Sequence, residues 1–416
     1  MRSSPPTPAT SPHPGVGGRE FVLLVAAMMS IGALAIDIML PALPAIASAL
    51  EVRDANSIQW VLAAYTYGFG ASQLIWGPLT DRFGRKPILG IALTGFVVAS
   101  VAAALASSFA MLIVARTVQG MFAASTRVLV TSVVRDCYSG RAMARVMSLA
   151  QFLFFAVPIL APSIGAALLL VGPWELNFWA LALLSLGILL WTGARLPETL
   201  PPERRRAISP ASLMSAWSTA LGNRYSLGYA IAQAMLFGAL LGYLNSSEQV
   251  IGEVFDARHR FPLIFATIAA AMGSATLLNA TLVERFGARK LSHGALIGVI
   301  VVGAVHLAVA VSGNETLVSF VALQALQLAM SGLIGANFSA MAMEEVGHIA
   351  GTAASVQGTI TNLGGATLGI LIGQAYDRTT VPVAAGFLVA GLAALAIVLI
   401  VERGRLFVPY RPSAPA

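Results

Sequence analysis

Charged residues and cysteine are scarce in this sequence, and both shortages exclude whole classes of protein. Asp, Glu, Lys and Arg together make up 10% of the 416 residues, whereas an average soluble domain carries roughly 25%. So few charges cannot cover the surface of a globule in water, which excludes a soluble protein. The single cysteine, Cys137, cannot form an internal disulfide, which excludes the disulfide-rich class.

Motifs of catalysis are also missing. The chain contains no His-Glu-x-x-His zinc motif, no Gly-x-Ser-x-Gly nucleophile motif and no Walker-type phosphate loop. An intramembrane enzyme would need a nucleophile with its base or a metal cluster, and ATP-driven transport would need the phosphate loop. We therefore expect a protein that is not an enzyme and that holds no metal and no cofactor.

Apolar residues are abundant: 57% of the chain is hydrophobic and the mean hydropathy is +0.81. This is enough for about a dozen membrane spans of roughly 20 residues each. The predicted fold class is therefore an all-α membrane protein. Apolar runs between short polar breaks predict twelve transmembrane helices, near residues 20–40, 58–77, 88–106, 110–133, 146–171, 175–194, 226–247, 261–282, 292–312, 317–340, 353–374 and 382–402.

The distribution of basic residues predicts the orientation of the chain in the membrane. Most of the 25 Lys and Arg residues fall in the two tails and in alternate loops, while Arg53, Arg258, Arg260 and Arg378 fall in the opposite loops. Cytoplasmic loops carry such an excess, so both termini are expected in the cytoplasm. The sequence pI of about 10.0 then indicates attraction to the anionic inner leaflet rather than binding of nucleic acid.

Polar segments divide the chain into five parts. Residues 1–19 are rich in Pro, Ser, Thr and Gly and are expected to form a disordered cytoplasmic tail. The longest internal polar stretch, 196–223, is interpreted as a cytoplasmic linker between two halves of six helices each, at 20–195 and 224–403. A second cytoplasmic tail is expected at 404–416.

A loop motif occurs twice, about half a chain apart. The first copy reads Gly77-Pro-Leu-Thr-Asp81-Arg82-Phe-Gly84-Arg85-Lys86, and the second reads Glu284-Arg285-Phe-Gly287. Such a duplication predicts two like halves related by an axis along the membrane normal. Glycine permits a tight turn between two helices, and an acid beside an arginine can lock neighbouring helices. The alternative is a basic turn that serves only the orientation of the chain.

The segment 77–87 resembles the signature loop of the major facilitator superfamily, where this loop latches the inner gate. Four further segments resemble its bicyclomycin/chloramphenicol-resistance (Bcr/CflA) type drug:proton antiporters. The resemblance implies two six-helix lobes, alternating access and export of a drug in exchange for protons, although relatives of this type also export metabolites. The segments are Asp37-Ile-Met-Leu-Pro-Ala-Leu-Pro44, Arg116-Thr-Val-Gln119-Gly, Val134-Arg-Asp-Cys-Tyr138 and, in the implied antiporter helix, Pro158-Ile-Leu-Ala-Pro162-Ser-Ile-Gly165.

Charged residues inside the spans are candidates for function, because a charge at the bilayer centre costs at least about 2.5–3.5 kcal/mol. Asp37 is the one acid that lies clearly within a predicted span, and Arg116 is expected at a similar depth in the fourth span. We hypothesise that Asp37 is the protonation switch or a cation-contacting acid, and that Arg116 tunes its protonation. A static buried ion pair between the two is the alternative.

Other polar residues within the spans have two interpretations each. Arg127, about three turns beyond Arg116, would suit an anionic or polar neutral substrate, or else be an interhelical strut or a cytoplasmic gate residue. Glu248 is interpreted as a second titrating acid or as part of a solvated helix end. His306 is interpreted as a residue of a peripheral helix, with a proton role as the alternative. Neutral residues expected at the cavity or its mouth are Gln119, Asn245, Gln249, Gln327 and Asn337.

These observations predict a proton-coupled secondary transporter of a bacterial inner membrane that exports a small amphipathic compound or drug. Its expected partners are the substrate, protons and the lipid bilayer, with no nucleic acid, and it is expected to work as a monomer. A metabolite symporter or uniporter of the same fold is the alternative. A receptor would need neither Asp37 opposite Arg116 nor the paired loops.

Overall fold

The computed structural model describes residues 16–205 and 209–408, and these residues form helices and connecting turns with no β-strand. The first half contains α1 (Gly18–Asp37), η1 (Leu40–Ala42), α2 (Leu43–Ala49), η2 (Ala55–Gln59), α3 (Trp60–Phe83), α4 (Arg85–Ala104), α5 (Phe109–Cys137), α6 (Gly140–Val171) and α7 (Glu175–Arg195). The connection contains η3 (Pro202–Arg204) and α8 (Pro210–Gly222). The second half contains α9 (Arg224–Gln249), η4 (Val250–Val254), η5 (Arg258–Arg260), α10 (Phe261–Phe286), α11 (Ala288–Val311), α12 (Leu317–Gly332), α13 (Gly335–Ala342), η6 (Gly347–Ile349), α14 (Ala350–Gln374) and α15 (Val381–Val401).

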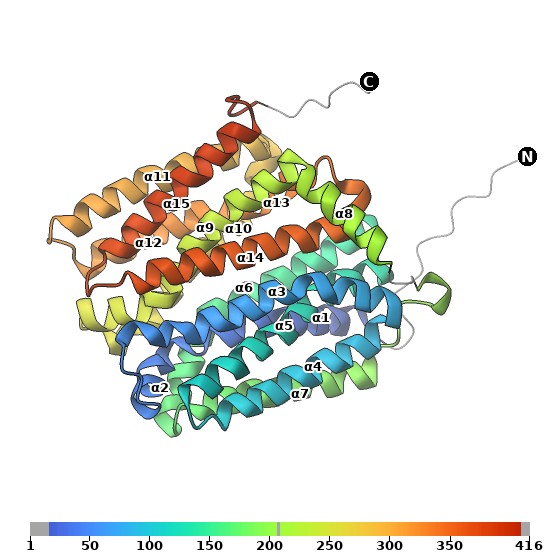
Figure 1. The fold of residues 1–416 in the computed structure, drawn as a ribbon, viewed down its shortest axis with the longest axis horizontal. Helices are drawn as coiled ribbons and strands as arrows, with labels where there is room; N and C mark the ends of the chain where they lie inside the picture. The colour runs from blue at the N-terminus through green and yellow to red at the C-terminus, as the bar shows by residue number, and fades with distance from the viewer. Residues whose placement is uncertain (1–15, 206–208, 409–416) are drawn as a thin grey trace, which may run out of the picture.

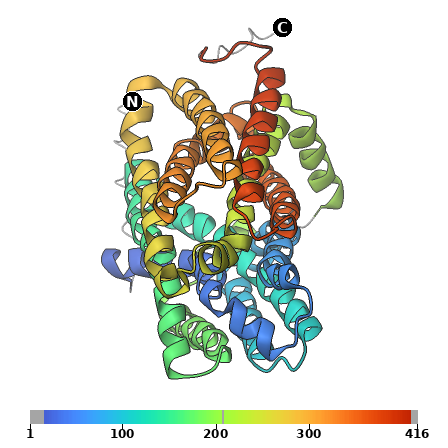
Figure 2. The same cartoon turned by 90° about the vertical axis from the view of Figure 1, so that its left-hand side faces the viewer.

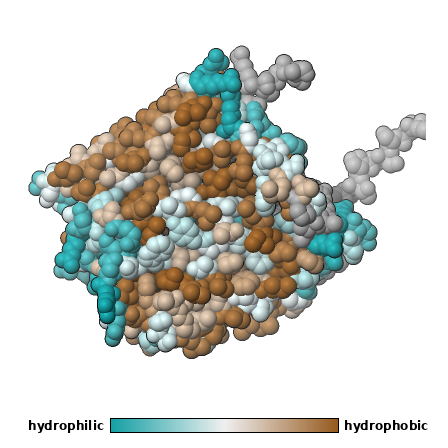
Figure 3. Space-filling view, viewed as in Figure 1, coloured by the Kyte–Doolittle hydropathy of each residue, from teal (hydrophilic) through white to brown (hydrophobic). Residues whose placement is uncertain are grey.

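The two halves lie side by side as two helical lobes (Figures 1 and 2). Both chain ends and α8 lie at one end of the bundle, which we call the terminal end, and α2 lies at the other, which we call the distal end (Figure 1). Hydrophobic residues form a broad band between these ends, and hydrophilic residues gather at the ends themselves (Figure 3). Such a surface is typical of a helical bundle that spans a membrane, with the helices running from one end to the other.

Ten helical stretches within the described residues are long and apolar enough to cross a bilayer. The helices α3 and α14 are as long as these, with 24 and 25 residues, but are more polar. At a rise of about 1.5 Å per residue each still exceeds the roughly 30 Å of the hydrocarbon core. Their polarity has a structural reason, because α3 and α14 pack against each other where the two lobes meet.

The interface between the lobes consists of two helix pairs, α3 with α14 and α6 with α10. In a two-half repeat, α3 corresponds to α10 and α6 corresponds to α14. The repeat therefore exchanges one pair for the other, as a two-fold axis between the lobes requires.

Several predicted boundaries are confirmed and three are corrected. The division at 171–174 is confirmed, since α6 ends at Val171 and α7 begins at Glu175. The first predicted helix breaks at Asp37, and the tenth breaks between α12 and α13. The segment predicted as a polar linker, 196–223, contains the helix α8, whose Trp217 packs against a small apolar cluster around Val346. Most of the predicted tails, at 1–15 and 409–416, lies outside the described residues.

Glycine controls the close crossing of α3 and α5. A Cβ added to Gly120 would collide with the carbonyl oxygen of Tyr65, and one added to Gly68 would collide with that of Thr117. The two backbones therefore touch on both sides of the crossing. This contact fixes α5, and with it Arg116, against the helix that faces the other lobe.

We predict that Gly120→Ala lowers the thermal unfolding midpoint of the detergent-solubilised protein, because overpacking a tight contact costs about 1–3 kcal/mol. The matched control is Gly187→Ala in α7, where an added Cβ meets no atom within 4 Å. This control should keep or raise the midpoint, since alanine is the better helix former. Equal midpoints for the two variants would contradict the proposed crossing.

Candidate functional site

Asp37 lies at a break in the first membrane-crossing segment. Pro41 follows it by four residues, so the N–H that would continue the helix by bonding to the Asp37 carbonyl is missing, and α1 ends at Asp37. The side chain is buried, with 6% of its surface exposed. Its carboxylate forms no hydrogen bond or ion pair within the described parts of the chain. The break thus places an unpaired acid inside the bundle.

Helix α6 packs directly onto this break. A Cβ at Gly165 would collide with the carbonyl oxygen of Ile38, the residue after Asp37. Pro158 and Pro162 lie within α6 on the approach to this contact, and α6 remains one continuous helix. The predicted antiporter helix and the predicted acid therefore form one structural unit.

Arg116 does not pair with Asp37, so the static ion pair is absent from this structure. Arg116 is fully buried, donates through Nε to the Val61 carbonyl (2.9 Å) and through Nη1 to Gln119 Oε1 (2.5 Å). Gln119 in turn donates to Ser100 Oγ (2.7 Å). The remaining nitrogen, Nη2, has no hydrogen-bond partner among the described residues.

Two tyrosines that the sequence did not single out surround Asp37. The Tyr65 ring lies 4.6 Å from the Arg116 guanidinium, and its hydroxyl donates to the Gly32 carbonyl of α1 (3.2 Å). Tyr65 is also within electrostatic range of Asp37, so both charged groups influence this tyrosine. From the other lobe, Tyr243 is within range of Asp37 as well. Its buried hydroxyl has no partner among the described residues.

Arg127 combines a deep position with an accessible side chain. Its guanidinium lies deep among protein atoms, yet the residue is exposed, as is Thr131 one turn further along α5. This combination fits a side chain that borders a space within the bundle. Arg127 forms no ion pair within the described ranges, so the interhelical strut is not observed.

Hydrogen bonds between the lobes gather at the distal end. Gln59 Nε2 donates to Gln249 Oε1 (2.8 Å) and to the Gly373 carbonyl (2.9 Å). Gln374 Nε2 donates to the Asn56 carbonyl (2.7 Å), and Asn56 Nδ2 donates back to the Gln374 carbonyl (3.2 Å). We call this set of four amides, Asn56, Gln59, Gln249 and Gln374, the distal gate. The sequence predicted Gln249 at this mouth, with Asn245 beside it in contact range of Gly373.

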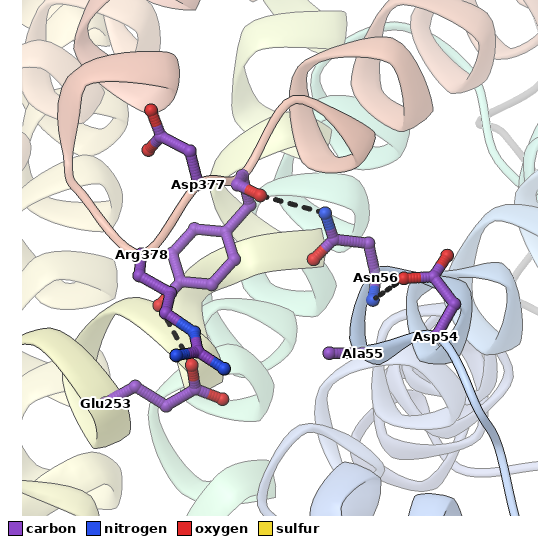
Figure 4. Close-up of a pocket in the computed structure, with 7 residues that line it drawn as sticks. Asp54, Ala55, Asn56, Glu253, Asp377 and Arg378 are labelled. Atoms are coloured by element: carbon purple, nitrogen blue, oxygen red, sulfur yellow. Dashed lines mark hydrogen bonds between the residues drawn. The ribbon is translucent and has the colours of Figure 1, made fainter.

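Tyr376 completes the distal gate. Its carbonyl accepts from Asn56 Nδ2 (2.9 Å), and its hydroxyl lies within bonding distance of the Gln249 carbonyl (3.2 Å) and Glu253 (3.3 Å). Burial and the neighbouring Glu253 carboxylate raise the pKa of the Tyr376 hydroxyl above its usual range, so it remains a donor. A cavity of about 250 Å³ opens beside these residues between the lobes (Figure 4).

The lobes are closed at the distal end and not bonded at the terminal end. Apart from the distal gate, one inter-lobe hydrogen bond occurs within the described ranges, from Tyr67 Oη to Thr367 Oγ1 (3.0 Å). None occurs on the terminal side of it among residues 16–205 and 209–408. The inter-lobe hydrogen bonds that hold the lobes together are therefore concentrated at the distal end.

Each lobe has an ion-pair clamp at the terminal end. Gly84 adopts a positive φ of 101° in the turn between α3 and α4. Next to it, Arg85 binds Asp81 (2.6 Å) and Asp136 at the end of α5 (3.0 Å). Glu198 accepts from the backbone N–H groups of Arg85 (2.9 Å) and Lys86 (3.2 Å). The predicted lock of the first loop is therefore present, and three acids hold it.

The second clamp uses different residues from those predicted. Gly287 again has a positive φ, 80°, as its loop requires. Glu284, however, is exposed and forms no ion pair among the described residues, and Arg285 is exposed as well. Arg289 takes the central place instead, with Glu344 (2.7 Å) and Glu402 (2.8 Å) as its partners. Spacings close to the half-chain repeat of Gly84 and Gly287, although not identical to it, relate Asp136 to Glu344 and Glu198 to Glu402. This approximate repeat is a signal that could have found these acids.

The remaining predicted site residues lie elsewhere than expected. Glu248 is neither solvated nor free: it is buried and paired with Arg258 (2.7 Å). Asn337 donates to Asn279 Oδ1 (2.8 Å) in a contact between α13 and α10, and Gln327 contacts His306 (3.2 Å). Both are buried within the second lobe rather than at the cavity. Arg82 is exposed, and Gly77 lies opposite Ser355 of the other lobe.

Two lobes that meet around a buried acid and close through reversible hydrogen bonds are the arrangement of a multi-pass membrane transporter. Comparison with known proteins agrees: residues 23–369 match the Major Facilitator Superfamily, and the chain belongs to this superfamily. It is therefore a transporter rather than an enzyme.

Relatives of the chain are transporters from bacteria. It is 28% identical over 87% of its length to an uncharacterized MFS-type transporter, YdgK, of Bacillus subtilis, covering 90% of that protein. It is 27% identical over 87% of its length to a bicyclomycin resistance protein homolog of Haemophilus influenzae, covering 91%. Multidrug resistance protein D of Escherichia coli is 30% identical over 54% of this chain and 55% of that protein. The structure of the human organic anion transporter MFSD10 has the same fold, with a TM-score of 0.63 at 18% identity over 92% of this chain and 98% of that one.

We predict that Gln59→Leu shifts the lobes toward a distally open state. The change removes three inter-lobe hydrogen bonds, two that Gln59 Nε2 donates and one that its Oε1 accepts from Gln374 (3.3 Å). Each is worth about 1 kcal/mol net, so the open population should rise by roughly tenfold or more. Spin labels at Arg53→Cys and His259→Cys, exposed distal residues of opposite lobes, report the separation by double electron–electron resonance in a Cys137→Ala background. Gln233→Leu is the control, since Gln233 bonds to Ser339 within one lobe. An unchanged distance distribution for Gln59→Leu would rule out the distal gate.

Proposed function

We propose that the chain is a twelve-span secondary transporter of a bacterial inner membrane that exports a small amphipathic compound or drug in exchange for protons. The terminal end, with both termini and most basic residues, faces the cytoplasm, and the distal end faces outside. The protein works as a monomer. The relatives named for bicyclomycin and multidrug resistance support drugs as the substrate class, and the unpaired, buried Asp37 at the break of α1 supports proton coupling.

Asp37 is suited to exchange a proton for a substrate because no group among residues 16–205 and 209–408 neutralises it permanently. The C-terminal end of a helix carries partial negative charge, so an ionised carboxylate at the end of α1 is destabilised until a proton or a cationic group neutralises it. Tyr65 and Tyr243 supply hydroxyls around the acid from opposite lobes. A change in the protonation of Asp37 therefore acts on both lobes at once.

Arg116 supports this role from inside the first lobe. It is held by the Val61 carbonyl and Gln119 and lies against the Tyr65 ring, which also belongs to the surroundings of Asp37. A positive group that is not in a direct pair with the acid leaves the carboxylate free to take up and release a proton. The proton and the substrate can then occupy this single site in turn, one entering after the other has left.

Alternating access follows from the interface between the lobes. Rocking about the pairs α3–α14 and α6–α10 would open the distal gate while closing the space that Arg127 borders. Gly165 allows α6 to follow the break of α1 closely, so a movement of α6 changes the surroundings of Asp37. The Arg85 and Arg289 clamps keep the turns of each lobe rigid during this movement.

We predict that Asp37→Asn abolishes transport driven by a pH gradient, because the neutral amide cannot exchange a proton. In proteoliposomes containing a pH-sensitive dye, adding exported drugs should release protons with the wild type and not with the variant. Exchange of labelled for unlabelled drug, which needs no proton movement, should persist and shows that the variant is folded. Glu51→Gln, at an exposed acid in the connection after α2, is the control. Undiminished proton release by Asp37→Asn would eliminate the switch.

We also predict that Arg127→Gln weakens transport of anionic substrates and leaves neutral ones unchanged. A hydrogen bond to a charged group contributes about 1.5–3 kcal/mol, so the half-saturating concentration of an anion should rise at least about tenfold. Arg127→Lys should retain part of the effect. Arg135→Gln, an exposed arginine further along α5, is the matched control. If anionic, neutral and cationic compounds all change equally, Arg127 belongs to the cytoplasmic gate instead. Net uptake rather than export in the same assay would favour the metabolite symporter.

A further inference from the structure

The second lobe contains a buried titratable pair that has no part in the proposed exchange at Asp37. His306 of α11 is fully buried, and its Nε2 lies 2.9 Å from Glu315 Oε1 in the connection between α11 and α12. The second oxygen of Glu315 accepts a short hydrogen bond from Thr380, the residue before α15. Glu315 thus joins the imidazole to a distal loop.

Gln327 allows the imidazole to hold either one or two protons. Its Oε1 lies 3.2 Å from His306 Nδ1, a position that requires a proton on Nδ1. Its Nε2 has no partner among the described residues, and rotating the amide would turn this donor toward an unprotonated Nδ1. On the other side of the ring, Nε2 and Glu315 Oε1 lie within ion-pair distance but form no hydrogen bond with each other. The imidazole can therefore gain or lose the proton on Nδ1 while Gln327 remains its partner.

Few other charged groups lie near His306 and Glu315 that could influence their protonation. The helices α12 and α15 contain no charged residue, and those of α11 lie more than three turns away at the terminal end. Phe320 packs on the His306 ring at 5.7 Å, and Phe255, next to η4, packs on Phe320 at 5.3 Å. The remaining charged or titratable groups on neighbouring elements are Glu253 in η4, Asp256 after it, Arg258, His259 and Arg260 of η5, and Asp377 and Arg378 in the loop before α15.

The loop held by Glu315 is the one that supplies the distal gate. Residues 375–380 connect α14 to α15, and Thr380 is the last residue of this loop. The loop includes Tyr376, whose carbonyl accepts a hydrogen bond from Asn56 of the other lobe (2.9 Å). Asp377 and Arg378 of this loop line the cavity between the lobes opposite Asn56 (Figure 4). Any change at Glu315 therefore acts on the gate through one short loop.

We propose that His306 and Glu315 form a second proton-binding site, loaded from the distal side, whose protonation holds the distal gate closed. With the second proton, the imidazolium neutralises Glu315, and Glu315 anchors Thr380. Without this proton, Glu315 is a buried carboxylate lacking its opposite charge, an arrangement that is strongly destabilising. The carboxylate then turns toward the nearby distal surface and releases the loop. Acid outside closes the gate, and alkali loosens it.

This proposal goes beyond the exchange at Asp37 and can be tested without a transported compound. The probe is the spin-label pair at Arg53→Cys and His259→Cys in a Cys137→Ala background, measured in lipid nanodiscs. Between pH of about 5 and about 8, where histidine titrates, the distally open population of the parent should rise by at least roughly fivefold, in the range of a typical coupling between two sites. In His306→Gln and in Glu315→Gln this pH response should be lost.

The controls separate this site from Asp37 and from general damage. His293→Gln replaces another buried histidine of the same lobe, near the terminal end, and should keep the full response. Asp37→Asn should keep it as well. A response that persists in both His306→Gln and Glu315→Gln, that disappears only in Asp37→Asn, or that is missing from the parent would overturn the proposal. Because the probe measures lobe separation, failure of drug export by itself does not affect the result.

Discussion

A charged group inside an apolar bundle must find a partner, and the placement of partners organises this transporter. Arg85 and Arg289 are nearly buried, and each is bound by carboxylates that hold a helix turn in place. Removing one member of such a pair leaves an uncompensated charge and is costly, so these turns are fixed points. Asp37 has no such partner in the described part of the chain, which is why we propose that the coupling proton is exchanged at this acid.

The two lobes repeat the same scaffold but differ in where they hold acids. The clamp built on Gly84, Arg85, Asp136 and Glu198 has its counterpart in Gly287, Arg289, Glu344 and Glu402. The acid at the break of α1, in contrast, belongs to the first lobe, and the pair His306–Glu315 belongs to the second. This division is the basis of our two proposals, which place the exchange of the coupling proton in the first lobe and control of the gate in the second.

Much of the architecture follows from the sequence, because hydropathy and the duplicated loop report directly on spans and repeat. The acid Asp37 and the two glycine turns were predictable for the same reason: each breaks a local pattern. The break after α1 required weighing Pro41 against a strongly apolar run, and apolar periodicity alone predicts a continuous helix there.

The partners of Arg116 were not predictable, since Tyr65 and the Val61 carbonyl approach it from another helix. Glu284 was misjudged because a matching motif does not specify which neighbouring acid reaches the arginine first. The four amides of the distal gate come from η2, α9 and α14, and single neutral residues give no signal until the lobes are assembled.

The chemistry of the distal gate explains why its control must lie elsewhere. Its members are amides, carbonyls and a tyrosine hydroxyl whose raised pKa keeps it protonated, so the gate itself does not titrate. Each hydrogen bond contributes about 0.5–1.5 kcal/mol net, which makes the whole gate strong enough to close the lobes and weak enough to open in every cycle. Buried ion pairs in the same place would resist separation much more strongly. A gate of this strength can be shifted by a coupling of about 1–3 kcal/mol, and one protonation event at a neighbouring pair such as His306 and Glu315 supplies an effect of that size.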